Sequence, residues 1–343
     1  MESYPIRRLV FIRPGALGDT LLALPSLALA RAQWPTASIH FVARRDVGQL
    51  ARASGLADDF SPYDSPLWTA LFADEPPANS PVQRLIADST VVAWLPDADG
   101  AVQRNLQRFG AQASVIASGR PIPIASVQSP EHLAVTLARA LVPLGVNAPV
   151  TREALAAHFP PLHATPAEDA AADNFWRSTF PEHTGQTPVI ALHAGSGGAA
   201  KCWPSQSFAA LIQELVARGC APLLIEGPLD DEVTRAALAA SSLPQPAVAR
   251  NVPLGQLVAL LQCCASYIGN DSGVAHLAAL AGVPTLALFG PSDPGVWAPV
   301  GRQVTILRAD THRMEDIAVP AVIATLETLL SSPERLSPGS TSH

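Results

Sequence analysis

Short apolar runs of strand length alternate along the chain with longer segments of helical period. In the first half, the runs 9–13, 39–43, 91–95 and 114–117 predict strands, and the segments 20–33, 46–53, 101–109 and 130–144 predict helices. The second half repeats this plan, with strands predicted over 189–193, 223–226, 267–269, 285–289 and 304–307 and helices over 205–218, 231–240, 254–263, 273–281 and 315–330. Repeated alternation of strand and helix is typical of parallel sheets covered on both faces. The pattern therefore predicts an α/β protein with two doubly wound, Rossmann-like domains.

The boundary between the two halves is predicted within residues 148–187, which are rich in proline and turn-forming residues. We expect an N-terminal domain over 1–160, a C-terminal domain over 161–331 and a disordered tail over 332–343. Doubly wound sheets bind ligands beyond the carboxyl ends of their strands, and two such domains that face each other enclose a cleft. Functional residues are therefore expected directly after strands.

Composition and charge narrow the class of partner. The 343 residues are 48% hydrophobic and 15% charged, which is enough apolar material for sizeable cores and argues against extended disorder. The net charge of −7 arises from residues 151–343, and no basic stripe indicates nucleic acid. No apolar run reaches the roughly 18–20 residues of a membrane span, and the N-terminus does not resemble a secretory signal. The four cysteines fit neither a zinc site nor a disulfide framework, so the cytoplasm is the expected compartment.

The first predicted strand runs into the turn RPGALGD, residues 13–19, before a helix. Gly15 and Gly18 allow another group to approach the backbone closely. Asp19 has two interpretations that its position leaves open: a helix N-cap worth about 1 kcal/mol, or a carboxylate at the cleft that accepts a proton from a hydroxyl. The dinucleotide motif G-x-G-x-x-G is absent, which disfavours a nicotinamide oxidoreductase.

Lys201 is the only lysine among 22 lysine and arginine residues. It follows a predicted strand and a glycine-rich loop that begins with Gly195 and Ser196, and the backbone N–H groups of such a loop suit an anion. Lysine brings a compact charge with three donors, whereas arginine brings a wide planar fork. We interpret Lys201 as a ligand of a diphosphate in a tight pocket; the alternative is a solvated surface lysine.

A second candidate anion site follows the predicted strand 267–269. Asp271 or Ser272 can cap the next helix, which leaves the N–H groups of its first turn, from Gly273 on, for a phosphate. His276 lies on the same side of this helix. Simple capping beside a partly buried histidine is the alternative. Two glycine-containing strand ends in one half favour a site for a nucleoside diphosphate.

Two other polar features are weighed against this interpretation. The triplet Asp97-Ala98-Asp99 has a D-x-D pattern that can hold a metal, but we interpret it as a polar turn because cationic and dipolar groups elsewhere serve the phosphates. The histidines are not spaced as metal ligands. His193, at a strand end, either lines the cleft or is a satisfied core histidine.

Three sequence blocks occur in a characteristic order. They are R-x-G-A-L-G-D-x-x-x-x-x-P from Arg13, G-S-x-x-x-x-K-x-W-P from Gly195, and D-S-G-x-x-H-L-A-A-x-x-G-V-P-T-x-x-L-F-G-P-S-D-P from Asp271. With these blocks the chain resembles glycosyltransferase family 9, the ADP-heptose:lipopolysaccharide heptosyltransferase family, over roughly residues 8–330. The resemblance implies the GT-B fold, with two domains facing across a cleft, and an inverting, metal-independent transferase without a cofactor. It implies ADP-heptose as donor and the lipopolysaccharide core as acceptor, with a monomer at most peripherally in contact with the inner membrane.

The resemblance also implies roles for individual residues. Asp19 would be the general base, and Lys201 would neutralise the donor phosphate. The residues that would bind the donor diphosphate and sugar are Gly18, Gly195, Ser196, Lys201, Asp271, Ser272, Gly273 and His276.

The nucleoside and acceptor sites are less closely defined. Asn251 and Val252 fall where the family lines its adenine pocket, and either Glu226 or Asp230 would hold the ribose. Arg13 and Arg120 are candidates for contact with an anionic acceptor. Two departures leave the exact sugar and acceptor open: Leu22 stands where many members have a histidine, and Cys202 where a polar or basic residue is common.

Two other functions fit the same fold. A sugar-nucleotide epimerase or hydrolase would need no acceptor, and a non-catalytic nucleotide-sugar-binding protein would need no base. The presence of Asp19 disfavours the second alternative.

Overall fold

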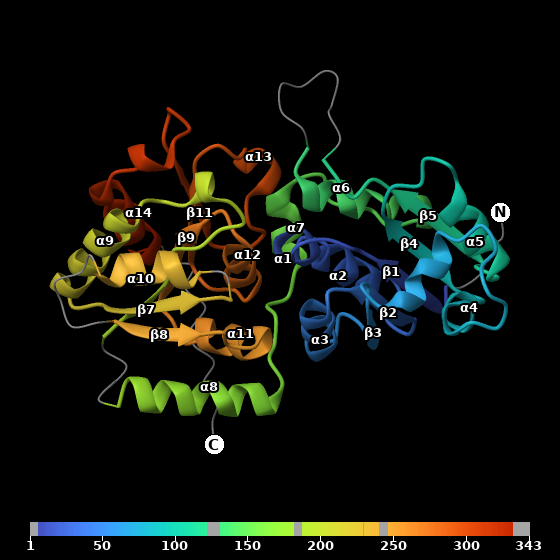
Figure 1. Ribbon diagram of the computed structural model, residues 1–343, viewed down its shortest axis with the longest axis horizontal. Helices are drawn as coiled ribbons and strands as arrows, with labels where there is room; N and C mark the ends of the chain where they lie inside the picture. The colour runs from blue at the N-terminus through green and yellow to red at the C-terminus, as the bar shows by residue number, and fades with distance from the viewer. Residues whose placement is uncertain (1–5, 122–130, 182–186, 229, 240–245, 332–343) are drawn as a thin grey trace.

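The computed structural model describes residues 6–121, 131–181, 187–228, 230–239 and 246–331. Two parallel sheets lie side by side, each with helices on both faces (Figure 1). The first sheet has the order β3-β2-β1-β4-β5 and the second the order β11-β10-β9-β6-β7-β8. In each sheet the strand order changes direction next to the first strand of that domain, between β1 and β4 in the first sheet and between β6 and β9 in the second, as in doubly wound folds. The predicted fold class of two Rossmann-like domains is therefore confirmed.

The N-terminal domain carries five strands and the helices around them. The strands are β1 (Arg8–Ile12), β2 (Ser38–Ala43), β3 (Asp59–Pro62), β4 (Thr90–Trp94) and β5 (Ala113–Ala117). The α-helices are α1 (Leu17–Leu21), α2 (Leu24–Gln33), α3 (Arg45–Ala53), α4 (Pro81–Ile86), α5 (Ala101–Arg108), α6 (Leu133–Arg139) and α7 (Arg152–His158), with 3₁₀ turns η1 (Pro66–Leu71) and η2 (Val142–Leu144).

The C-terminal domain repeats the plan with six strands. These are β6 (Val189–His193), β7 (Ala221–Glu226), β8 (Ala247–Arg250), β9 (Ser266–Asn270), β10 (Thr285–Phe289) and β11 (Val304–Arg308). The α-helices are α8 (Pro166–Thr179), α9 (Ser205–Ala217), α10 (Asp231–Ala239), α11 (Leu254–Gln262), α12 (Gly273–Leu280), α13 (Pro294–Trp297) and α14 (Val319–Ser331), with 3₁₀ turns η3 (Ala199–Lys201) and η4 (Met314–Asp316).

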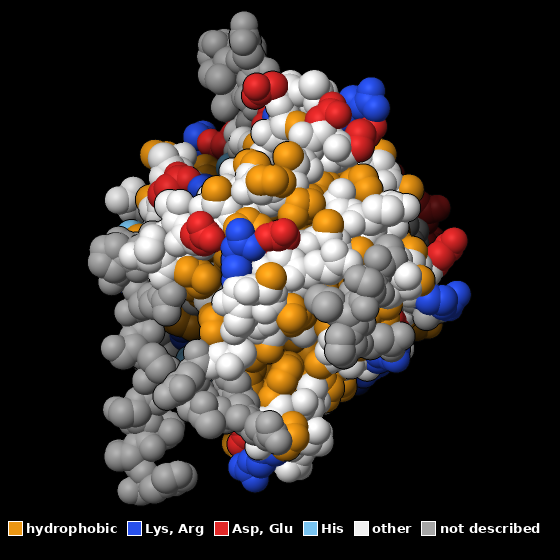
Figure 2. Space-filling view, turned by 90° about the vertical axis from the view of Figure 1, so that its left-hand side faces the viewer, with side chains coloured by type: hydrophobic (Ala, Val, Ile, Leu, Met, Phe, Trp, Pro, Cys, Tyr) orange, Lys and Arg blue, Asp and Glu red, His pale blue; other side chains and the backbone are white. Residues whose placement is uncertain are grey.

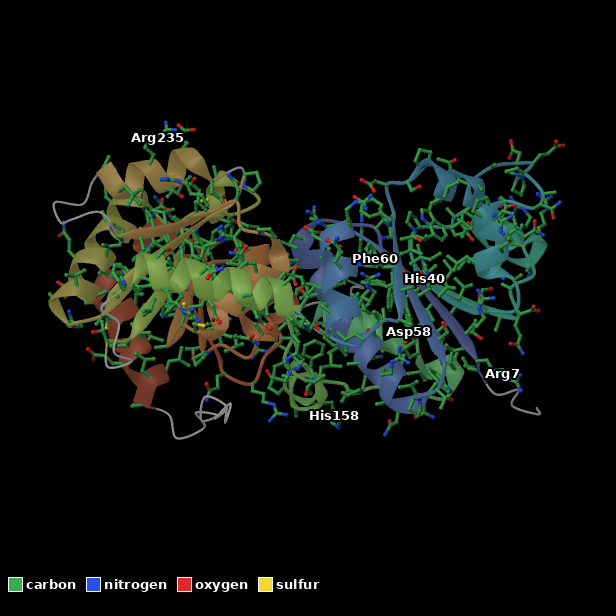
Figure 3. The ribbon with its side chains drawn as sticks, turned by 90° about the horizontal axis from the view of Figure 1, so that it is seen from below. Arg7, His40, Asp58, Phe60, His158 and Arg235 are labelled. Carbon is green, nitrogen blue, oxygen red and sulfur yellow. The ribbon has the colours of Figure 1, made fainter. Side chains whose placement is uncertain are left out.

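The central strands are buried on both faces, which explains their nearly continuous apolar sequences. Every residue of β4, β6, β9 and β10 is buried. In register, Val10 of β1 lies between His40 of β2 and Val91 of β4. His40 also reaches the next strand, where its Nε2 lies 2.8 Å from Ser61 Oγ. Seen from below, His40 and Phe60 lie within the N-terminal domain, away from the C-terminal domain (Figure 3).

The described elements depart from the sequence prediction in ways that have a local cause. The helix predicted over 20–33 is two helices, because Pro25 fits the first turn of α2 but has no N–H for the interior of a longer helix. The proline-rich stretch 148–187 contains α7 and α8 rather than loop alone, and α8 begins with a capping box formed by Thr165 and Glu168. The short strands β3 and β8 and the helix α4 were not predicted. The predicted tail 332–343 lies outside the described residues.

The chain passes from one sheet to the other between α7 and α8. The helix α7 packs on α2 and α6 of the first sheet, whereas α8 packs on α11 of the second. A seam joins the two domains through α1 with α12 and α3 with α11. One hydrophobic cluster continues across this seam, with Leu21 and Leu133 on one side and Leu257 and Val283 on the other.

A buried histidine also fixes the seam. His132 Nδ1 accepts a hydrogen bond from the Ala134 N–H at 3.2 Å, and Nε2 lies 2.9 Å from the carbonyl oxygen of Ala298 in the other domain. Because Nδ1 accepts, Nε2 carries the proton of a neutral ring. Burial lowers the pKa of His132 to about 4, so the ring is neutral at physiological pH.

The outer face of the C-terminal domain carries scattered charges of both signs among neutral and hydrophobic atoms, without a gathering of one sign (Figure 2). Arg218 at the end of α9 pairs there with Glu214 and Glu327. No helix among the described residues is long and apolar enough to cross a bilayer.

Candidate functional site

Most of the predicted site residues follow strands that lie beside the two points where strand order reverses; the exceptions are Arg120 after β5, Glu226 and Asp230 at the end of β7, and Asn251 and Val252 after β8. In the N-terminal sheet these strands are β1 and β4, and in the C-terminal sheet they are β6 and β9. The loops after neighbouring strands diverge at such a point and leave a crevice for a ligand. The turn after β1 and the loops after β6 and β9 therefore form the candidate site.

Asp19 is not the N-cap of its helix. Ala16 occupies that position without a side-chain capping bond, and Asp19 lies in the first turn with its side chain 35% exposed. Arg13 is buried next to it: Arg13 Nε donates to the carbonyl oxygen of Asp19 at 3.2 Å, and Nη2 lies 3.9 Å from the carboxylate. Burial lowers the pKa of Arg13, and the Asp19 carboxylate partly restores it. The carboxylate thus stands beside a fixed positive charge and remains open to solvent.

The first turns of α1 and α12 touch across the seam between the domains. A Cβ atom on Gly18 would lie 3.1 Å from His276 Cδ2, and a Cβ atom on Gly273 would lie 2.7 Å from Leu17 Cδ2. A larger residue at either glycine would require the side chain across the seam, His276 or Leu17, to shift. This contact brings the turn that carries Asp19 against the C-terminal glycine turn.

The lone lysine is anchored to the end of β9. Lys201 Nζ lies 2.7 Å from Asp271 Oδ2, and Ser292 Oγ donates to the same oxygen at 2.6 Å. Asp271 is buried, whereas the Lys201 side chain is 40% exposed. The ammonium has three donors, so it can face an anion in the crevice while it keeps its contact with Asp271. Ser292 was not selected from the sequence.

Two further polar residues hold the loops after β6 and β9 together. Ser196 Oγ donates to the carbonyl oxygen of Asp271 at 2.7 Å. Asn270 is fully buried; its Nδ2 donates to the carbonyl oxygen of Ala194 at 2.8 Å, and its Oδ1 accepts from the Trp203 N–H at 3.0 Å. Sequence reasoning missed Asn270, although an amide that ends an apolar strand at this point is a usable signal.

His276 on α12 is buried between the two domains, only 4% exposed. Its Nδ1 atom has no hydrogen-bond partner among the described residues. Burial lowers the pKa of His276 to about 4, against the attraction of Asp271. A neutral imidazole therefore faces the turn that contains Gly18, and its Nδ1 is buried without a partner among the described residues.

His193, at the end of β6, takes part in a buried polar chain. Its Nδ1 lies 3.2 Å from Ser272 Oγ, and its Nε2 lies 2.9 Å from Asp230 Oδ2. Ser272 is also the N-cap of α12, accepting from the Ala275 N–H at 3.4 Å. Asp230 accepts a second hydrogen bond from the Gly227 N–H at 2.9 Å. His193 is thus a buried histidine whose two ring nitrogens both have partners, in agreement with the second of its two interpretations.

The two acidic candidates for the ribose differ in what they already bind. Glu226 is 5% exposed; its Oε1 accepts from Arg250 Nε at 3.0 Å, whereas its Oε2 is buried without a partner among the described residues. Asn251 donates its N–H to the Glu226 carbonyl oxygen at 2.8 Å and has φ of 48°. Val252 follows it, half-buried. These residues line one end of β7 and β8.

The remaining candidates lie elsewhere on the N-terminal domain. Arg120 is exposed, and its backbone is bonded to Ser118, next to residues outside the described part. The Asp97 carboxylate accepts from the N–H groups of Val102 and Gln103 at 2.9 Å each, and so caps α5. Among the described residues no three His, Cys, Asp or Glu side chains are grouped as a metal site.

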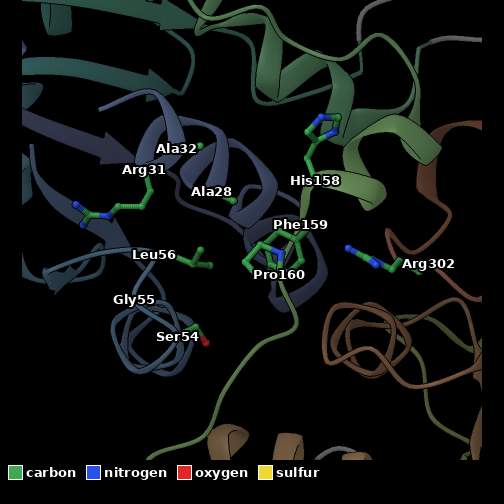
Figure 4. A pocket seen from close by; sticks show the side chains of 10 residues that line it. All are labelled: Ala28, Arg31, Ala32, Ser54, Gly55, Leu56, His158, Phe159, Pro160 and Arg302. Carbon is green, nitrogen blue, oxygen red and sulfur yellow. The ribbon is translucent and has the colours of Figure 1, made fainter. Parts of the chain in front are cut away.

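A cavity of about 440 Å³ lies on another part of the seam (Figure 4). Its lining comes from the ends of α2 and α3, the residues after α7 and one loop of the C-terminal domain: Ala28, Arg31, Ala32, Ser54, Gly55, Leu56, His158, Phe159, Pro160 and Arg302. None of the candidate site residues lines it. Since α2 and α3 end at the opposite edge of the sheet from the loops that follow β1 and β4, this cavity is distinct from the candidate site.

Comparison with known proteins matches residues 88–323 to the model of glycosyltransferase family 9 (heptosyltransferase). Over 131 residues the chain is 34% identical to "Lipopolysaccharide heptosyltransferase 2" of Escherichia coli (strain K12), an alignment that spans 37% of this chain and 38% of that relative.

Two solved structures share the fold. The crystal structure of a family 9 glycosyltransferase from Veillonella parvula DSM 2008 has a TM-score of 0.77 at 22% identity and covers 96% of this chain and 99% of its own. The structure of E. coli ADP-heptose lps heptosyltransferase II has a TM-score of 0.72 at 19% identity, with 94% and 98% covered.

Proposed function

Because the chain belongs to glycosyltransferase family 9, the heptosyltransferase family, we propose that it transfers a heptose from ADP-heptose to a hydroxyl group of a glycan, the lipopolysaccharide core. The observation that carries the proposal is the contact of α1 with α12, which places Asp19 and the Lys201–Asp271 pair on one seam. The names of similar proteins support the donor and acceptor: one is a lipopolysaccharide heptosyltransferase and another an ADP-heptose heptosyltransferase.

In this proposal the diphosphate of the donor binds at the start of α12. Gly273 and Val274 are the first two residues of the helix, and such N–H groups have no partner within it. These N–H groups and the positive end of the helix dipole would both attract the anionic diphosphate of the donor. Lys201 adds the compact positive charge, held in place by Asp271 and Ser292. His276 contacts the donor through its neutral ring.

The nucleoside is placed against the ends of β7 and β8. Glu226 is the better of the two candidates for the ribose hydroxyls, because its Oε2 is a buried acceptor without a partner in the described part of the chain, whereas Asp230 is bonded to His193 and Gly227. A buried carboxylate oxygen left unpaired is costly, and two ribose hydroxyls would satisfy it. Val252 offers apolar surface to the base.

Asp19 is proposed as the general base for an inverting displacement. The carboxylate takes the proton of the acceptor hydroxyl, the acceptor oxygen forms a bond to the anomeric carbon, and the bond from that carbon to the diphosphate oxygen breaks on the opposite face. The Arg13 guanidinium lies 3.9 Å from this carboxylate. The charge that develops on the leaving diphosphate is stabilised by Lys201 and the α12 N-terminus, which act most strongly in the transition state. We propose that no metal ion takes part.

A donor panel tests this function. ADP-, GDP-, UDP- and dTDP-linked sugars are compared by thermal shift and by nucleotide release, with and without a lipopolysaccharide acceptor that lacks heptose. We expect ADP-heptose to give the largest shift, release to require the acceptor, the product to have inverted anomeric configuration by NMR, and EDTA to leave the rate unchanged. Full-rate release of free sugar without acceptor would instead indicate a hydrolase or epimerase. Donor binding without any turnover would indicate a binding protein.

A further inference from the structure

Three polar side chains form a buried chain beside the proposed diphosphate site. Ser272 Oγ lies 3.2 Å from Nδ1 of His193, and Asp230 Oδ2 lies 2.9 Å from Nε2 of the same ring. The ring is 3% exposed, and its two nitrogens are bonded to two different loops, one after β7 and one after β9. The positions of protons along this chain decide what Ser272 can offer to a ligand.

With a neutral ring, the hydroxyl proton of Ser272 points away from the crevice. The hydrogen bond with His193 lowers the pKa of Asp230, so this carboxylate is an ionised acceptor and Nε2 must donate to it. In the neutral imidazole Nδ1 has no proton and can only accept, so its hydrogen bond with Ser272 uses the hydroxyl proton of Ser272. Tyr267 also interacts with the Ser272 side chain, and its protonated hydroxyl can donate to the Ser272 oxygen. The Ser272 oxygen meanwhile accepts the Ala275 N–H. It would face a phosphate as a lone pair, which is repulsive.

With a protonated ring, the same chain presents a donor. Nδ1 now donates to Ser272 Oγ, and the hydroxyl proton is free to bond to an anion. The Asp230 carboxylate compensates the charge of the imidazolium in this buried place. A bound diphosphate adds further negative charge close by, which favours the same protonation state.

We propose that His193 is a positioning residue that takes up a proton when the donor binds, so that the Ser272 hydroxyl can donate to a diphosphate oxygen. The proposal rests on the proposed function, since it takes the diphosphate to bind at Ser272. The proton comes from solvent, and no covalent bond changes. His193 contacts neither the donor nor the acceptor, and acts through Ser272.

Among the described groups around His193, Asp230 is the charge that no other nearby group compensates. The other titratable groups described nearby are Tyr267 on β9, Cys202 after η3, the Lys201–Asp271 ion pair and His276 on α12. Burial raises the pKa of Tyr267 and, together with Asp230, that of Cys202, and burial lowers the pKa of His276. These three groups are therefore neutral near pH 7, and the ion pair carries no net charge.

The glycine loop fixes the Asp230 carboxylate in position. A Cβ atom on Gly195 would overlap with the Asp230 carboxylate, so Gly195→Ala must displace it from His193. A Cβ atom on Gly197, two residues further on, meets nothing within 4 Å. The two alanine variants differ in little except their effect on Asp230, and they form a matched pair.

Calorimetry with ADP on the full chain tests the proposal. ADP binding is measured at pH about 8, where its phosphates are fully ionised because their second pKa is about 6, in two buffers of different ionisation enthalpy. We expect the wild type to take up a measurable fraction of one proton, and its ADP affinity to fall with rising pH, up to about tenfold per unit for a full proton. His193→Asn keeps a polar group at the Nδ1 position but cannot be protonated. It should take up no proton and show a flat pH profile.

The other variants separate this role from a structural one. Ser272→Ala keeps His193 and Asp230 but has no hydroxyl to release, so proton uptake should fall below that of the wild type, and the uptake that remains reflects the charge of the diphosphate alone. Gly195→Ala should reduce uptake, and Gly197→Ala should keep it. In turnover assays His193→Asn should raise KM for the donor severalfold more than it lowers kcat.

Each adverse outcome has a distinct meaning. ADP binding without proton uptake in the wild type would overturn the proposal and leave the function intact. Unchanged proton uptake in His193→Asn would also overturn the proposal. If His193→Asn does not fold, unchanged proton uptake in Ser272→Ala would overturn it. Failure of ADP, GDP, UDP and dTDP all to bind would overturn both the proposal and the proposed function.

Discussion

Lys201 and Asp271 form an ion pair, with the ammonium nitrogen 2.7 Å from a carboxylate oxygen that also accepts a hydrogen bond from Ser292. Asp271 is buried and Lys201 is half-exposed, so the pair fixes a positive charge at the edge of the crevice rather than inside it. Its value lies in the position of the charge relative to the start of α12.

The first prediction is that turnover requires the compact cation of lysine at position 201. Lys201→Arg keeps the charge but replaces a point donor by a planar fork, which cannot occupy the same space between Asp271 and a diphosphate. We expect an unchanged melting temperature and a kcat at least about tenfold lower, which corresponds to about 1.4 kcal/mol of lost transition-state stabilisation. Arg218→Lys, the opposite exchange on the exposed face of α9, is the control. Near-wild-type kinetics in Lys201→Arg would show that the lysine is an ordinary surface residue.

The second prediction is that turnover requires the carboxylate of Asp19. Asp19→Asn keeps the shape of the side chain and the contact with Arg13 but cannot accept a proton. We expect kcat to fall about 10²–10⁴-fold, the range for loss of a general base, with the Kd for donor nearly unchanged because Asp19 belongs to the other domain. Asp64→Asn, at an exposed carboxylate after β3, is the control. Turnover within about threefold of the wild type would remove Asp19 from the mechanism.

The sequence could predict the elements whose signals are local. The central strands are continuous apolar runs, and β6 and β10 match their predicted bounds. Position after a strand also identified Asp19, Lys201 and Asp271, because strand ends meet at one edge of a parallel sheet. The chemical roles of these residues remain predictions, because their positions do not show which reaction they take part in.

Other features depend on partners far apart in the chain, and the sequence could not show them. The edge strands β3 and β8 are short, and pairing rather than propensity makes them strands. The choice between Glu226 and Asp230 depended on His193, 37 residues before Asp230 in the chain. Likewise, the fit of Leu17 against Gly273 joins two domains and has no local signal.

That fit gives the third prediction. Gly273→Ala places a Cβ atom 2.7 Å from Leu17 Cδ2, and forces α1 away from α12. We expect a loss of stability of about 1–3 kcal/mol, typical of an overpacked contact, and a fall in kcat because Asp19 moves with α1. Leu17→Ala in the same chain removes the overlap and should recover most of the melting temperature and kcat. If the double variant is as slow as Gly273→Ala alone, the glycine acts through the donor and not through the contact between domains.

The fourth prediction concerns the stability of the seam as a function of pH. Burial lowers the pKa of His132 to about 4 from its ordinary value of 6.5. Above pH 6.5 the ring is neutral in both the folded and the unfolded chain, and pH has no effect through it. As the pH falls from 6.5 towards 4, the unfolded chain binds a proton first, so the free energy of unfolding decreases, by about 3 kcal/mol. Below pH 4 both states are protonated and the loss is complete.

His132→Asn cannot titrate, and its free energy of unfolding, from urea titrations between pH 7 and 4, should fall less steeply than that of the wild type. His158→Asn, at an exposed histidine on α7, should keep the wild-type slope. Equal slopes in wild type and His132→Asn would mean that protonation of His132, which removes the Nδ1 acceptor for the Ala134 N–H, does not destabilise the fold.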